Sequence, residues 1–502
     1  MMKTTIISTT KKIWTSFKIK LRKKRTKTQT RSSKKLYIDA LALVQKNKSG
    51  VGQTLEQTLE SLLLMPDIKK DWSIYLVVPL GKGKYLKRYN KTIAHIKTIY
   101  FPARILNLLL GLRLLPPLDI FLGQGIYLFP NYRNWPLCRS RSLTYIYDLS
   151  FVLFPETVQP RNRKYLTNNI ENWITNTDVI ITITHWMRQA IETYFNDAKN
   201  KVKVVYCGVN KNLFYARSNK EIQIVKKRYN ITYKQYILFV GNLEPRKNLS
   251  LLISAYLGLP KELKDKYGLV IVGSDGWLNG DLLAQIATED AKGQKIYKVQ
   301  KYVNNEDLPA IYSGATLLVH PAIYEGFGLT PLEAIACGTQ VLVSDIPAAR
   351  EVLGDAPVYF NPYSVNNLQH KIIDSLTNQQ KDVPNIAVDN FSWEQSARTL
   401  YNYIDEQNQL GLRKISFKVI LKTMLHRIDL TTLRLLGDKQ INFYQPQSGH
   451  NKAELLKKIY ISLLDNEQSV IQKNLLSGYN KMKNCLIKIL KKTRRVLKME
   501  HQ

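Results

Sequence analysis

The sequence of 502 residues has only four cysteines, which lie far apart and form no Cys-x-x-Cys pair. This spacing indicates neither a cysteine zinc site nor a disulfide framework and favours a reducing compartment. Long apolar runs are also missing, because the most apolar stretch, residues 99–123, is interrupted by Arg104, Arg113 and Asp119. It falls short of the ~20 apolar residues that a spanning helix needs. The N-terminal residues lack the apolar region of a signal peptide. We therefore expect neither secretion nor a membrane-spanning helix.

Acidic residues are scarce where basic residues are concentrated. The chain has 74 Lys and Arg against 39 Asp and Glu, a formal net charge of +35. Residues 1–35 contain 13 basic residues and no acidic one, and residues 409–502 contain 19 and 6. Two cationic ends favour an anionic partner, either a membrane leaflet or a nucleic acid. No nucleic-acid reader motif accompanies them, so we rank nucleic-acid binding last.

Hydrophobic residues make up 44% of the chain, enough for full-sized cores. From Leu36 onward, short β-rich runs alternate with helical patterns, which is typical of parallel sheets wrapped by helices. We therefore expect two consecutive α/β domains. The strands predicted for the first are Leu36–Val44, Ser73–Val78, Lys97–Phe101, Asp119–Leu122, Leu143–Tyr147, Val179–Thr184 and Val202–Tyr206. Those predicted for the second are Tyr236–Val240, Leu269–Val272, Ile296–Gln300, Ala315–Val319, Gln340–Val343 and Val358–Phe360.

The same patterns place the domain boundaries. The two α/β domains are expected at residues 36–209 and 235–391, joined by a polar linker at 210–234. Ser392 is a good N-cap for a helix over residues 392–408 that closes the second domain. Ligands of parallel α/β domains bind at the carboxyl ends of the strands, so two such domains predict a cleft between them.

The two ends differ from this body. Residues 1–35 are expected to form a basic arm, and residues 409–502 a basic helical extension. In the extension, apolar residues between Met482 and Leu497 follow a helical stripe flanked by Lys and Arg. Such a helix can lie on an anionic membrane or dock on its own protein, and the pattern does not separate these readings. We expect a cytoplasmic protein that is peripheral on the inner face of the membrane.

The most informative segment, residues 324–338, reads YEGFGLTPLEAIACG and follows a predicted strand. Gly326 and Gly328 allow backbone amides to approach an anion, and a helix beginning near Pro331 points its positive end toward the same place. The segment therefore predicts a phosphate pocket.

Two carboxylates, Glu325 and Glu333, lie eight positions apart around this loop, and both can face one pocket. Carboxylates beside a diphosphate are electrostatically costly, so we expect them to hold sugar hydroxyls. The alternative is a capping box formed by Thr330 and Glu333, which needs no ligand.

Cations for the phosphates follow the first strand of the second domain, where residues 241–248 read GNLEPRKN. Arg246 offers a planar fork of donors and Lys247 a point charge. The alternative is an exposed basic turn in which Asn248 caps a helix.

These residues resemble glycosyltransferase family 4, retaining enzymes of the GT-B fold. Glu325 to Glu333 matches the family's E-x(7)-E motif, and residues 241–248 are similar to its G-x-L-x-x-R-K-N phosphate element. The resemblance covers residues 36–408 and points to the bacterial mannosyltransferase-like branch that builds polysaccharides. Further similar segments are residues 48–52, 147–151, 154–156, 178–184, 205–210 and 343–347.

The resemblance implies two facing Rossmann-like parallel-sheet domains, with residues 36–209 binding the acceptor and residues 235–391 the nucleotide sugar. It implies retaining transfer of a sugar, with mannose as the first guess, from a nucleotide-diphosphate sugar to a glycan or lipid-linked acceptor in polysaccharide or glycoconjugate synthesis. No cofactor is implied beyond the nucleotide-sugar co-substrate. The chain has no D-x-D sequence, so we expect cations rather than a metal to hold the diphosphate.

The resemblance also implies residue roles. Glu333 binds the ribose hydroxyls and Glu325 the hydroxyls of the donor sugar, while Arg246 and Lys247 stabilise the departing diphosphate. The catalytic candidates are Asp148, Glu325, Arg246 and Lys247. The donor-binding candidates are Gly50, Gly52, Gly241, Arg246, Lys247, Tyr302, Val303, Glu325, Gly326, Phe327, Gly328, Leu329 and Glu333.

One departure is Tyr147, where many relatives have His. Tyr is a poor general base near neutrality, so Asp148 is left to orient the acceptor or sugar, or alternatively to cap a turn. His185 and His320 have no second ligand at suitable spacing, which argues against a metal site. The departure keeps open a second hypothesis, a catalytically silent, membrane-docked protein that binds a nucleotide sugar or glycan.

Overall fold

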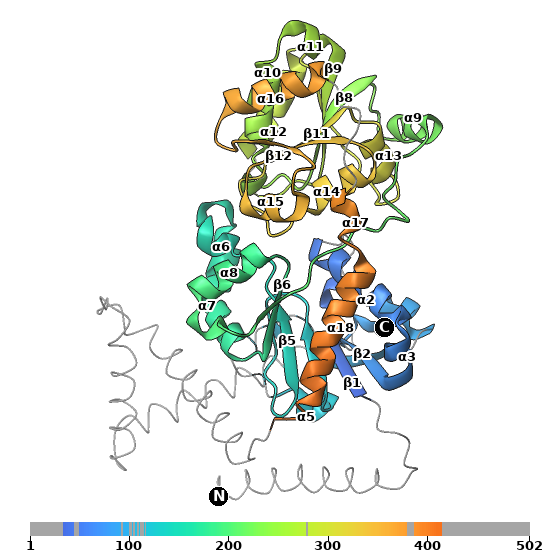
Figure 1. Ribbon diagram of the computed structural model, residues 1–502, viewed down its shortest axis with the longest axis vertical. Helices are drawn as coiled ribbons and strands as arrows, with labels where there is room; N and C mark the ends of the chain where they lie inside the picture. The colour runs from blue at the N-terminus through green and yellow to red at the C-terminus, as the bar shows by residue number, and fades with distance from the viewer. Residues whose placement is uncertain are drawn as a thin grey trace, which may run out of the picture.

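A computed structural model describes residues 34–413 with short gaps and shows two lobes, each a sheet wrapped by helices (Figure 1). The gaps are residues 45–49, 92–93, 100–102, 104–105, 108–109, 111–114, 116, 278–279 and 379–385. Most of both basic ends, and every prediction made for residues 1–33 and 414–502, therefore lie outside the described residues. Lys34 and Lys35, assigned to the N-terminal arm, instead begin the first strand.

The first lobe contains a parallel sheet with the strand order β3-β2-β1-β4-β5-β6-β7. Most residues of its central strands β1, β4 and β5 are buried, as expected for parallel strands that helices cover on both faces. The strands are β1 (Lys34–Asp39), β2 (Trp72–Pro79), β3 (Ala94–Ile99), β4 (Ile126–Phe129), β5 (Arg141–Tyr145), β6 (Val179–Thr182) and β7 (Val202–Val204).

The second lobe repeats this plan with the order β10-β9-β8-β11-β12-β13, again parallel throughout. All six residues of β9 are buried. The strands are β8 (Gln235–Val240), β9 (Tyr267–Val272), β10 (Ile296–Lys298), β11 (Leu317–His320), β12 (Gln340–Ser344) and β13 (Val358–Phe360). Two Rossmann-like parallel sheets therefore confirm the predicted fold class.

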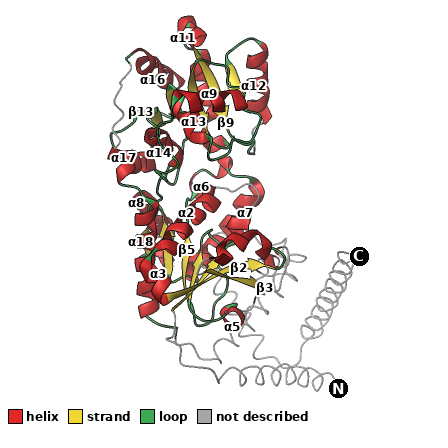
Figure 2. Cartoon of the chain, turned by 90° about the vertical axis from the view of Figure 1, so that its right-hand side faces the viewer, coloured by secondary structure: helices red, strands yellow, loops and turns green. Residues whose placement is uncertain are grey.

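Helices pack around both sheets (Figure 2). Those of the first lobe are α2 (Gly50–Leu64), α3 (Pro66–Asp71), α5 (Asp119–Leu122), α6 (Ser150–Leu153), α7 (Pro160–Thr175) and α8 (His185–Tyr194), with 3-10 turns η1 (Leu41–Val44), η2 (Gly83–Lys91), η3 (Pro155–Thr157) and η4 (Asn196–Ala198). The later ones are α9 (Asn219–Arg228), η5 (Pro245–Lys247), α10 (Leu249–Leu257), α11 (Lys261–Lys266), α12 (Gly280–Ala291), α13 (Leu308–Ser313), α14 (Leu329–Ala336), α15 (Pro347–Leu353), α16 (Val365–Thr377), α17 (Ile386–Asp389) and α18 (Trp393–Gln409).

The first predicted strand is too long at its carboxyl end. β1 stops at Asp39, whose Oδ1 accepts a hydrogen bond from the backbone amide of Leu41 at 3.0 Å. This bond turns the chain into η1, so the apolar residues up to Val44 pack on the sheet without belonging to it.

The strand predicted at Asp119–Leu122 is wrong, because these residues form α5. The Asp119 carboxylate is buried and accepts backbone hydrogen bonds from Cys138, Arg139 and Ser140 at 2.8–2.9 Å. An apolar run with a single acid resembles a strand end, but here the acid ties down a loop that comes later in the chain. The strand position beside β1 is taken by β4.

The segment expected to be a linker, residues 210–234, contains α9. A capping box starts this helix, with Ser218 and Glu221 each bonding the other's backbone amide. Ile222 and Val225 are buried, and α9 packs against α13 of the second lobe. The segment therefore includes a helix of the second lobe, which its polar composition concealed.

The helix expected to close the second domain instead returns to the first. Ser392 caps α18 as predicted, and α18 packs along α2 and against β5. Leu400 and Ile404 are fully buried there, and Asp405 pairs with Lys34 at 2.5 Å. The helical periodicity located the element correctly, but it carried no information on which sheet the apolar face covers.

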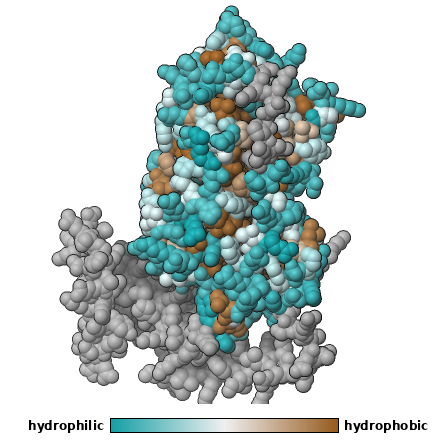
Figure 3. Space-filling model, viewed as in Figure 1, coloured by the Kyte–Doolittle hydropathy of each residue, from teal (hydrophilic) through white to brown (hydrophobic). Residues whose placement is uncertain are grey.

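The surface view in Figure 3 is mainly hydrophilic, with hydrophobic atoms in small groups. Among the described residues, none of the helices combines the length and the apolar character needed to cross a bilayer.

Candidate active site

The site lies where loops from the carboxyl ends of both sheets meet. The loop after β5 carries Asp148, the loop after β8 carries Arg246 and Lys247, and the loop after β11 carries Glu325. The two lobes touch here, because the Tyr324 hydroxyl accepts a hydrogen bond from the backbone amide of Leu149 at 2.7 Å. Parallel strands place polar loop residues at one edge of a sheet, so two facing edges bring together residues distant in sequence.

Glu325 is the centre of this cluster. Its Oε2 lies 3.0 Å from Nη1 of Arg246, and its Oε1 is bonded by the ammonium of Lys247. Burial alone would raise the pKa of this carboxyl, but Lys247 and Arg246 outweigh burial and hold the pKa well below its usual range. Glu325 is therefore ionised at neutral pH and its charge is compensated by two cations.

His320 completes the cluster from the end of β11. Its Nε2 lies 3.1 Å from Oε1 of Glu325, and its Nδ1 is buried without a hydrogen-bond partner in the described part of the chain. Burial lowers the pKa of His320, because a charged ring would be poorly solvated there. The arrangement fits a neutral imidazole whose Nε2–H donates to Glu325.

Arg246 has further partners besides Glu325. Its Nε lies 3.2 Å from Oε2 of Glu244, and its Nη1 donates to the backbone oxygen of Tyr324 at 3.3 Å. Burial would lower the pKa of Arg246, but the surrounding carboxylates, Glu325 and Asp148 foremost, raise it. The guanidinium is a fixed cation between the two lobes, so the alternative of an exposed basic turn is wrong. The predicted capping role of Asn248 is also wrong, because its side chain makes no capping hydrogen bond to α10.

The glycine-rich loop enters α14 earlier than expected. Gly328 is the N-cap, in a left-handed conformation with φ of 95°, and α14 begins at Leu329 rather than near Pro331. A residue with a side chain would be strained at this φ. No side chain caps this helix, so the capping box of Thr330 and Glu333 is wrong. The first-turn amides remain directed at the loop, as an anion site requires.

Gly326 has a role that the sequence did not indicate. A Cβ at this position would lie 2.4 Å from the backbone oxygen of Tyr147, in the other lobe. The carbonyl of Gly326 also accepts a hydrogen bond from the Thr184 hydroxyl at 3.1 Å. The absence of a side chain therefore allows the two lobes to touch at the glycine-rich loop.

Glu333 lies one turn into α14, apart from the Glu325 cluster. The Tyr312 hydroxyl donates to its Oε2 at 2.9 Å. Burial raises the pKa of Glu333 to about 8, and the bond from Tyr312 offsets only part of that effect. Glu333 therefore keeps its proton to a higher pH than an exposed carboxyl does, and in that form it can donate a hydrogen bond.

Tyr147 and Asp148 take different positions at the end of β5. The Tyr147 ring is buried and stacks on Tyr145 at 5.1 Å, and burial raises the pKa of its hydroxyl well above the usual range. Asp148 Oδ1 accepts from the backbone amide and the hydroxyl of Ser150, at 3.0 and 2.8 Å. Asp148 thus holds a turn, as in the alternative reading, and it also lines the cavity described next.

A cavity of about 410 Å³ opens between the lobes. Of the predicted site residues, its lining includes Asp148 and Arg246. The complete lining is Asp39, Leu41, Ala42, Pro130, Asn131, Tyr132, Arg133, Asp148, Ser150, Val158, Asn162, Tyr165, Leu166, Trp173, Glu244, Arg246 and Trp277. Most of it belongs to the first lobe, and the second lobe contributes its charged loop after β8.

Comparisons with known proteins fit this geometry. Residues 221–387 match the family described as Glycosyl transferases group 1. This part of the chain belongs to that family. The chain is 32% identical over 252 residues to O-antigen chain mannosyltransferase B of Escherichia coli, which covers 50% of this chain and 65% of that protein. It is 29% identical over 243 residues to O-antigen chain mannosyltransferase RfbU of Salmonella typhimurium, covering 48% and 62%. The match spans less than two thirds of either relative.

Solved structures support the GT-B fold of this chain. Sucrose-phosphate synthase from Thermosynechococcus elongatus superimposes with a TM-score of 0.56 at 16% identity, covering 75% of this chain and 100% of that one. Anabaena HepE, in complex with UDP and glucose, gives 0.55 at 16% identity, covering 74% and 99%. At these identities the likeness concerns the fold.

The group 1 domain contains Arg246, Lys247, Glu325 and Glu333, whereas Asp148 lies outside it. The other donor-binding candidates are scattered. Gly50 and Gly52 begin α2, Tyr302 is 60% exposed and Val303 is buried in the core. Phe327 packs edge-on against Phe391, and Gly241 follows β8 beside Lys247. Their contact with a donor stays a prediction.

Sequence reasoning missed Asp39, Arg133, Glu244 and Trp277. Glu244 lies within the GNLEPRKN segment, and Asp39 is the last residue of β1, so the carboxyl ends of strands were the available signal. Arg133 and Trp277 come from loops without a motif. Trp277 reaches the first lobe, where its Nε1 donates to the backbone oxygen of Thr157 at 2.8 Å.

A further contact between the two lobes lies away from the cavity and involves a carboxylate. Glu351 of α15 accepts hydrogen bonds from the backbone amides of His185 and Trp186, at 2.6 and 2.8 Å. These amides begin α8 of the first lobe, where a negative charge is favoured. The His185 backbone therefore takes part in a contact between lobes. Within the described ranges, no group of three or more His, Cys, Asp or Glu could hold a metal ion.

Proposed function

We propose that the protein is a retaining glycosyltransferase that moves a hexose, with mannose as the first candidate, from a nucleotide-diphosphate sugar to a glycan or lipid-linked acceptor in polysaccharide synthesis. The observation that carries the proposal is the pair of partly buried cations, Arg246 and Lys247, that share Glu325, with Arg246 lining a 410 Å³ cavity formed by both lobes. The O-antigen mannosyltransferase relatives support the choice of sugar and pathway class.

The cation pair supplies the charge that such a transfer needs. Breaking the bond between the anomeric carbon and the diphosphate leaves negative charge on the leaving group, and pre-positioned cations stabilise that charge. Arg246 and Lys247 are held in place by Glu325, which is itself ionised. When a diphosphate takes over the cations, the Glu325 carboxylate becomes available to the hydroxyls of the donor sugar.

The acceptor hydroxyl approaches from the cavity on this proposal. Asp148 lines the cavity, and its carboxylate, which Ser150 holds at Oδ1, can accept a bond from that hydroxyl. Because the Tyr147 ring is buried against Tyr145, it takes no part in proton transfer. The leaving phosphate, on the same face of the sugar as the acceptor, receives the proton.

The test is nucleotide release from a panel of GDP-, UDP- and dTDP-sugars with methyl α-mannoside as acceptor, followed by NMR of the product anomer. We expect turnover with one donor, GDP-mannose first, and a product that retains the donor's anomeric configuration. Turnover should persist in excess EDTA, because Arg246 and Lys247 hold the diphosphate. An inverted product would contradict retention, and binding without release from any donor would favour the catalytically silent alternative.

We further propose a cytoplasmic location on the inner face of the membrane, supported by the basic composition of residues 1–35 and 409–502. Salt-sensitive co-sedimentation of the full chain with anionic but not neutral vesicles is the expected result.

A further inference from the structure

One face of α7 continues from the cavity into a second, narrower pocket. Arg133, Tyr165 and Trp173 line both spaces, so the two are adjacent. From its N-terminal part, α7 contributes Asn162 and Leu166 to the cavity. Toward its other end, Asn169, Asn172 and Asn176 line the narrower pocket. These positions recur at intervals of three and four residues and therefore share one face of the helix.

The length of this face exceeds what one acceptor sugar needs. From Asn162 to Asn176 the chain rises by about 21 Å at 1.5 Å per residue. The cavity end holds Asp148 and Arg246, where the reacting hydroxyl belongs on the proposed function. The narrow pocket encloses about 40 Å³, room for the hydroxyl-bearing edge of a ring rather than for a whole ring.

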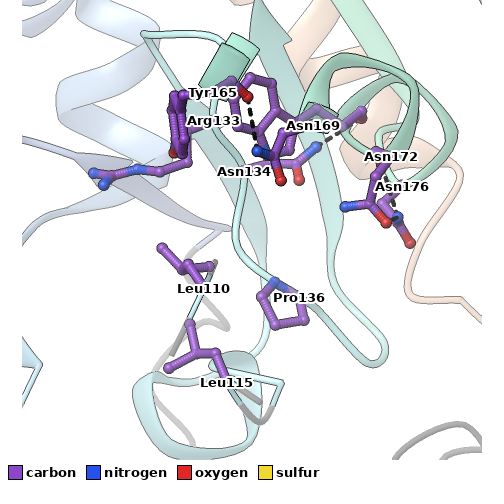
Figure 4. A pocket seen from close by; sticks show the side chains of 10 residues that line it. Leu110, Leu115, Arg133, Asn134, Pro136, Tyr165, Asn169, Asn172 and Asn176 are labelled. Atoms are coloured by element: carbon purple, nitrogen blue, oxygen red, sulfur yellow. Dashed lines mark hydrogen bonds between the residues drawn. The ribbon is translucent and has the colours of Figure 1, made fainter. Parts of the chain in front are cut away.

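The asparagines of the narrow pocket are held in fixed orientations. Nδ2 of Asn169 donates to the backbone oxygen of Tyr165 at 2.8 Å, and Nδ2 of Asn134 donates to that of Trp173 at 2.8 Å. In the described residues no donor reaches Oδ1 of either side chain. Figure 4 shows both asparagines on the α7 side of the pocket, with Pro136 and Leu115 opposite. Two oriented carbonyl oxygens are thus available to ligand hydroxyls.

Only part of the composition of this helix face serves folding, where Nδ2 of Asn176 donates to the backbone oxygen and to Oδ1 of Asn172 at 2.7 and 3.1 Å. Asn is less favourable than Ala in a helix interior, yet α7 places Asn169 and Asn172 there, and Asn176 at its C-cap. Among the described lining residues of the pocket, Arg133 alone is ionic, and it is already bonded to Asp39 at 3.3 Å and to Oδ1 of Asn107 at 2.6 Å. The ligand that fits is neutral and rich in hydroxyls.

Aromatic rings supply the apolar part of the same surface. Tyr165 and Trp173 lie with their ring centroids 5.5 Å apart where the two spaces join, and Tyr165 is 43% exposed. An exposed ring beside oriented amides suits the two sides of a sugar, one of C–H groups and one of hydroxyls. Among the described residues of the narrow pocket, a phosphate would find no unpaired cation.

We propose that the narrow pocket is a second acceptor subsite, which binds the neutral sugar next to the one that receives the transferred hexose. This inference rests on the proposed function and adds to it the class of acceptor, an uncharged glycan of at least two units. The asparagine face of α7 then favours an extended glycan over a single sugar.

The experiment compares kcat/KM for methyl α-mannoside and a methyl α-mannobioside with the full chain and its best donor. We expect the disaccharide to be preferred by about tenfold, as a few extra hydrogen bonds would give. Asn169→Ala should lower that preference about threefold to tenfold, mainly through KM. The matched control is Asn168→Ala, because Asn168 is the next residue on α7, is exposed and lies outside both pockets.

Both substitutions raise helix propensity equally, and thermal melts of the two variants account for the bond to Tyr165 that only Asn169→Ala loses. Asn134→Ala is a second variant of the same pocket and should lower the preference as Asn169→Ala does, because Asn134 presents the other available carbonyl oxygen. Equal kcat/KM for the two acceptors, or equal effects of Asn168→Ala and Asn169→Ala, would overturn the second subsite while leaving the transferase intact. A better kcat/KM for an anionic acceptor, such as a mannose phosphate, would overturn its neutral character. Transfer to no acceptor at all would overturn the proposed function and this inference with it.

Discussion

The loops of the second lobe and the cavity wall of the first lobe differ in the kind of ligand group that they can bind. In the second lobe, Arg246, Lys247, Glu325 and Glu244 form a compact network in which every charge has a partner. In the first lobe the wall is wide, and amides and aromatic rings make up much of it. A network of paired charges suits one highly charged group common to all donors. A wall in which amides and aromatic rings accompany a few charged residues suits ligands that differ in hydroxyl pattern, so it is where specificity can vary.

The sharpest test of the charged side is Arg246→Ala. Transfer should fall by about 100- to 1000-fold, because a group that stabilises the leaving charge is lost. Arg350→Ala removes an exposed arginine from the same lobe and should change little. Arg246→Lys keeps the charge without the planar fork, so it serves if the alanine variant unfolds. Steady-state kinetics measure this loss. Wild-type turnover in Arg246→Ala would show that the charged loops of the second lobe do not stabilise the leaving group.

Glu333 distinguishes a buried neutral carboxyl from the ionised Glu325. Its raised folded-state pKa means that the folded protein keeps a proton that the unfolded chain releases above about pH 4.5. Wild-type stability should therefore fall between pH 5 and pH 8 by up to about 1.4 kcal/mol per pH unit from this group. Glu333→Gln removes that dependence. Denaturant unfolding at several pH values should show that the free energy of unfolding of the variant rises relative to that of wild type as pH rises.

The control for this measurement is Glu394→Gln, at an exposed position of α18. Its stability should run parallel to that of wild type across the same pH range. Parallel curves for Glu333→Gln as well would show that Glu333 is already ionised near pH 5.

Gly326→Ala tests the contact by which the two sides meet. The added Cβ would clash with the Tyr147 carbonyl, so we expect a loss of about 1–3 kcal/mol in stability, together with slower transfer. Gly280→Ala adds the same atom where nothing lies within 4 Å. Equal melting temperatures for the two variants would mean that the lobes are not in close steric contact at this loop.

Tyr147→Phe should have the smallest effect. The ring stays stacked on Tyr145, and on our proposal the hydroxyl performs no chemistry, so transfer should remain within about twofold of wild type. Initial rates across pH 6–9 check this. A large loss in rate would give Tyr147 a part in proton transfer and extend the catalytic machinery into the first lobe.

The sequence predicted the second lobe better than the first, for physical reasons. Its motifs are local, so Arg246 with Lys247, and Glu325 with the loop to Glu333, could be placed within single segments. The cavity wall of the first lobe draws on Asp39, Arg133 and α7, which only the tertiary fold brings together. The misread strand at Asp119–Leu122 has the same origin, because its buried carboxylate serves a loop twenty residues away.

The return of α18 to the first lobe has a mechanical consequence. The chain passes between the lobes before α9 and again before α18, and the two passages are fastened together. Gly208 leaves no space for a Cβ beside the Trp393 backbone, and the amide of Val209 donates to Phe391 at 3.1 Å. Two crossing segments joined side by side resist rotation of one lobe about the long axis of the molecule, while they still permit hinge bending. On the proposed function, any opening of the lobes to admit donor and release nucleotide is thereby confined to hinge bending at these two segments.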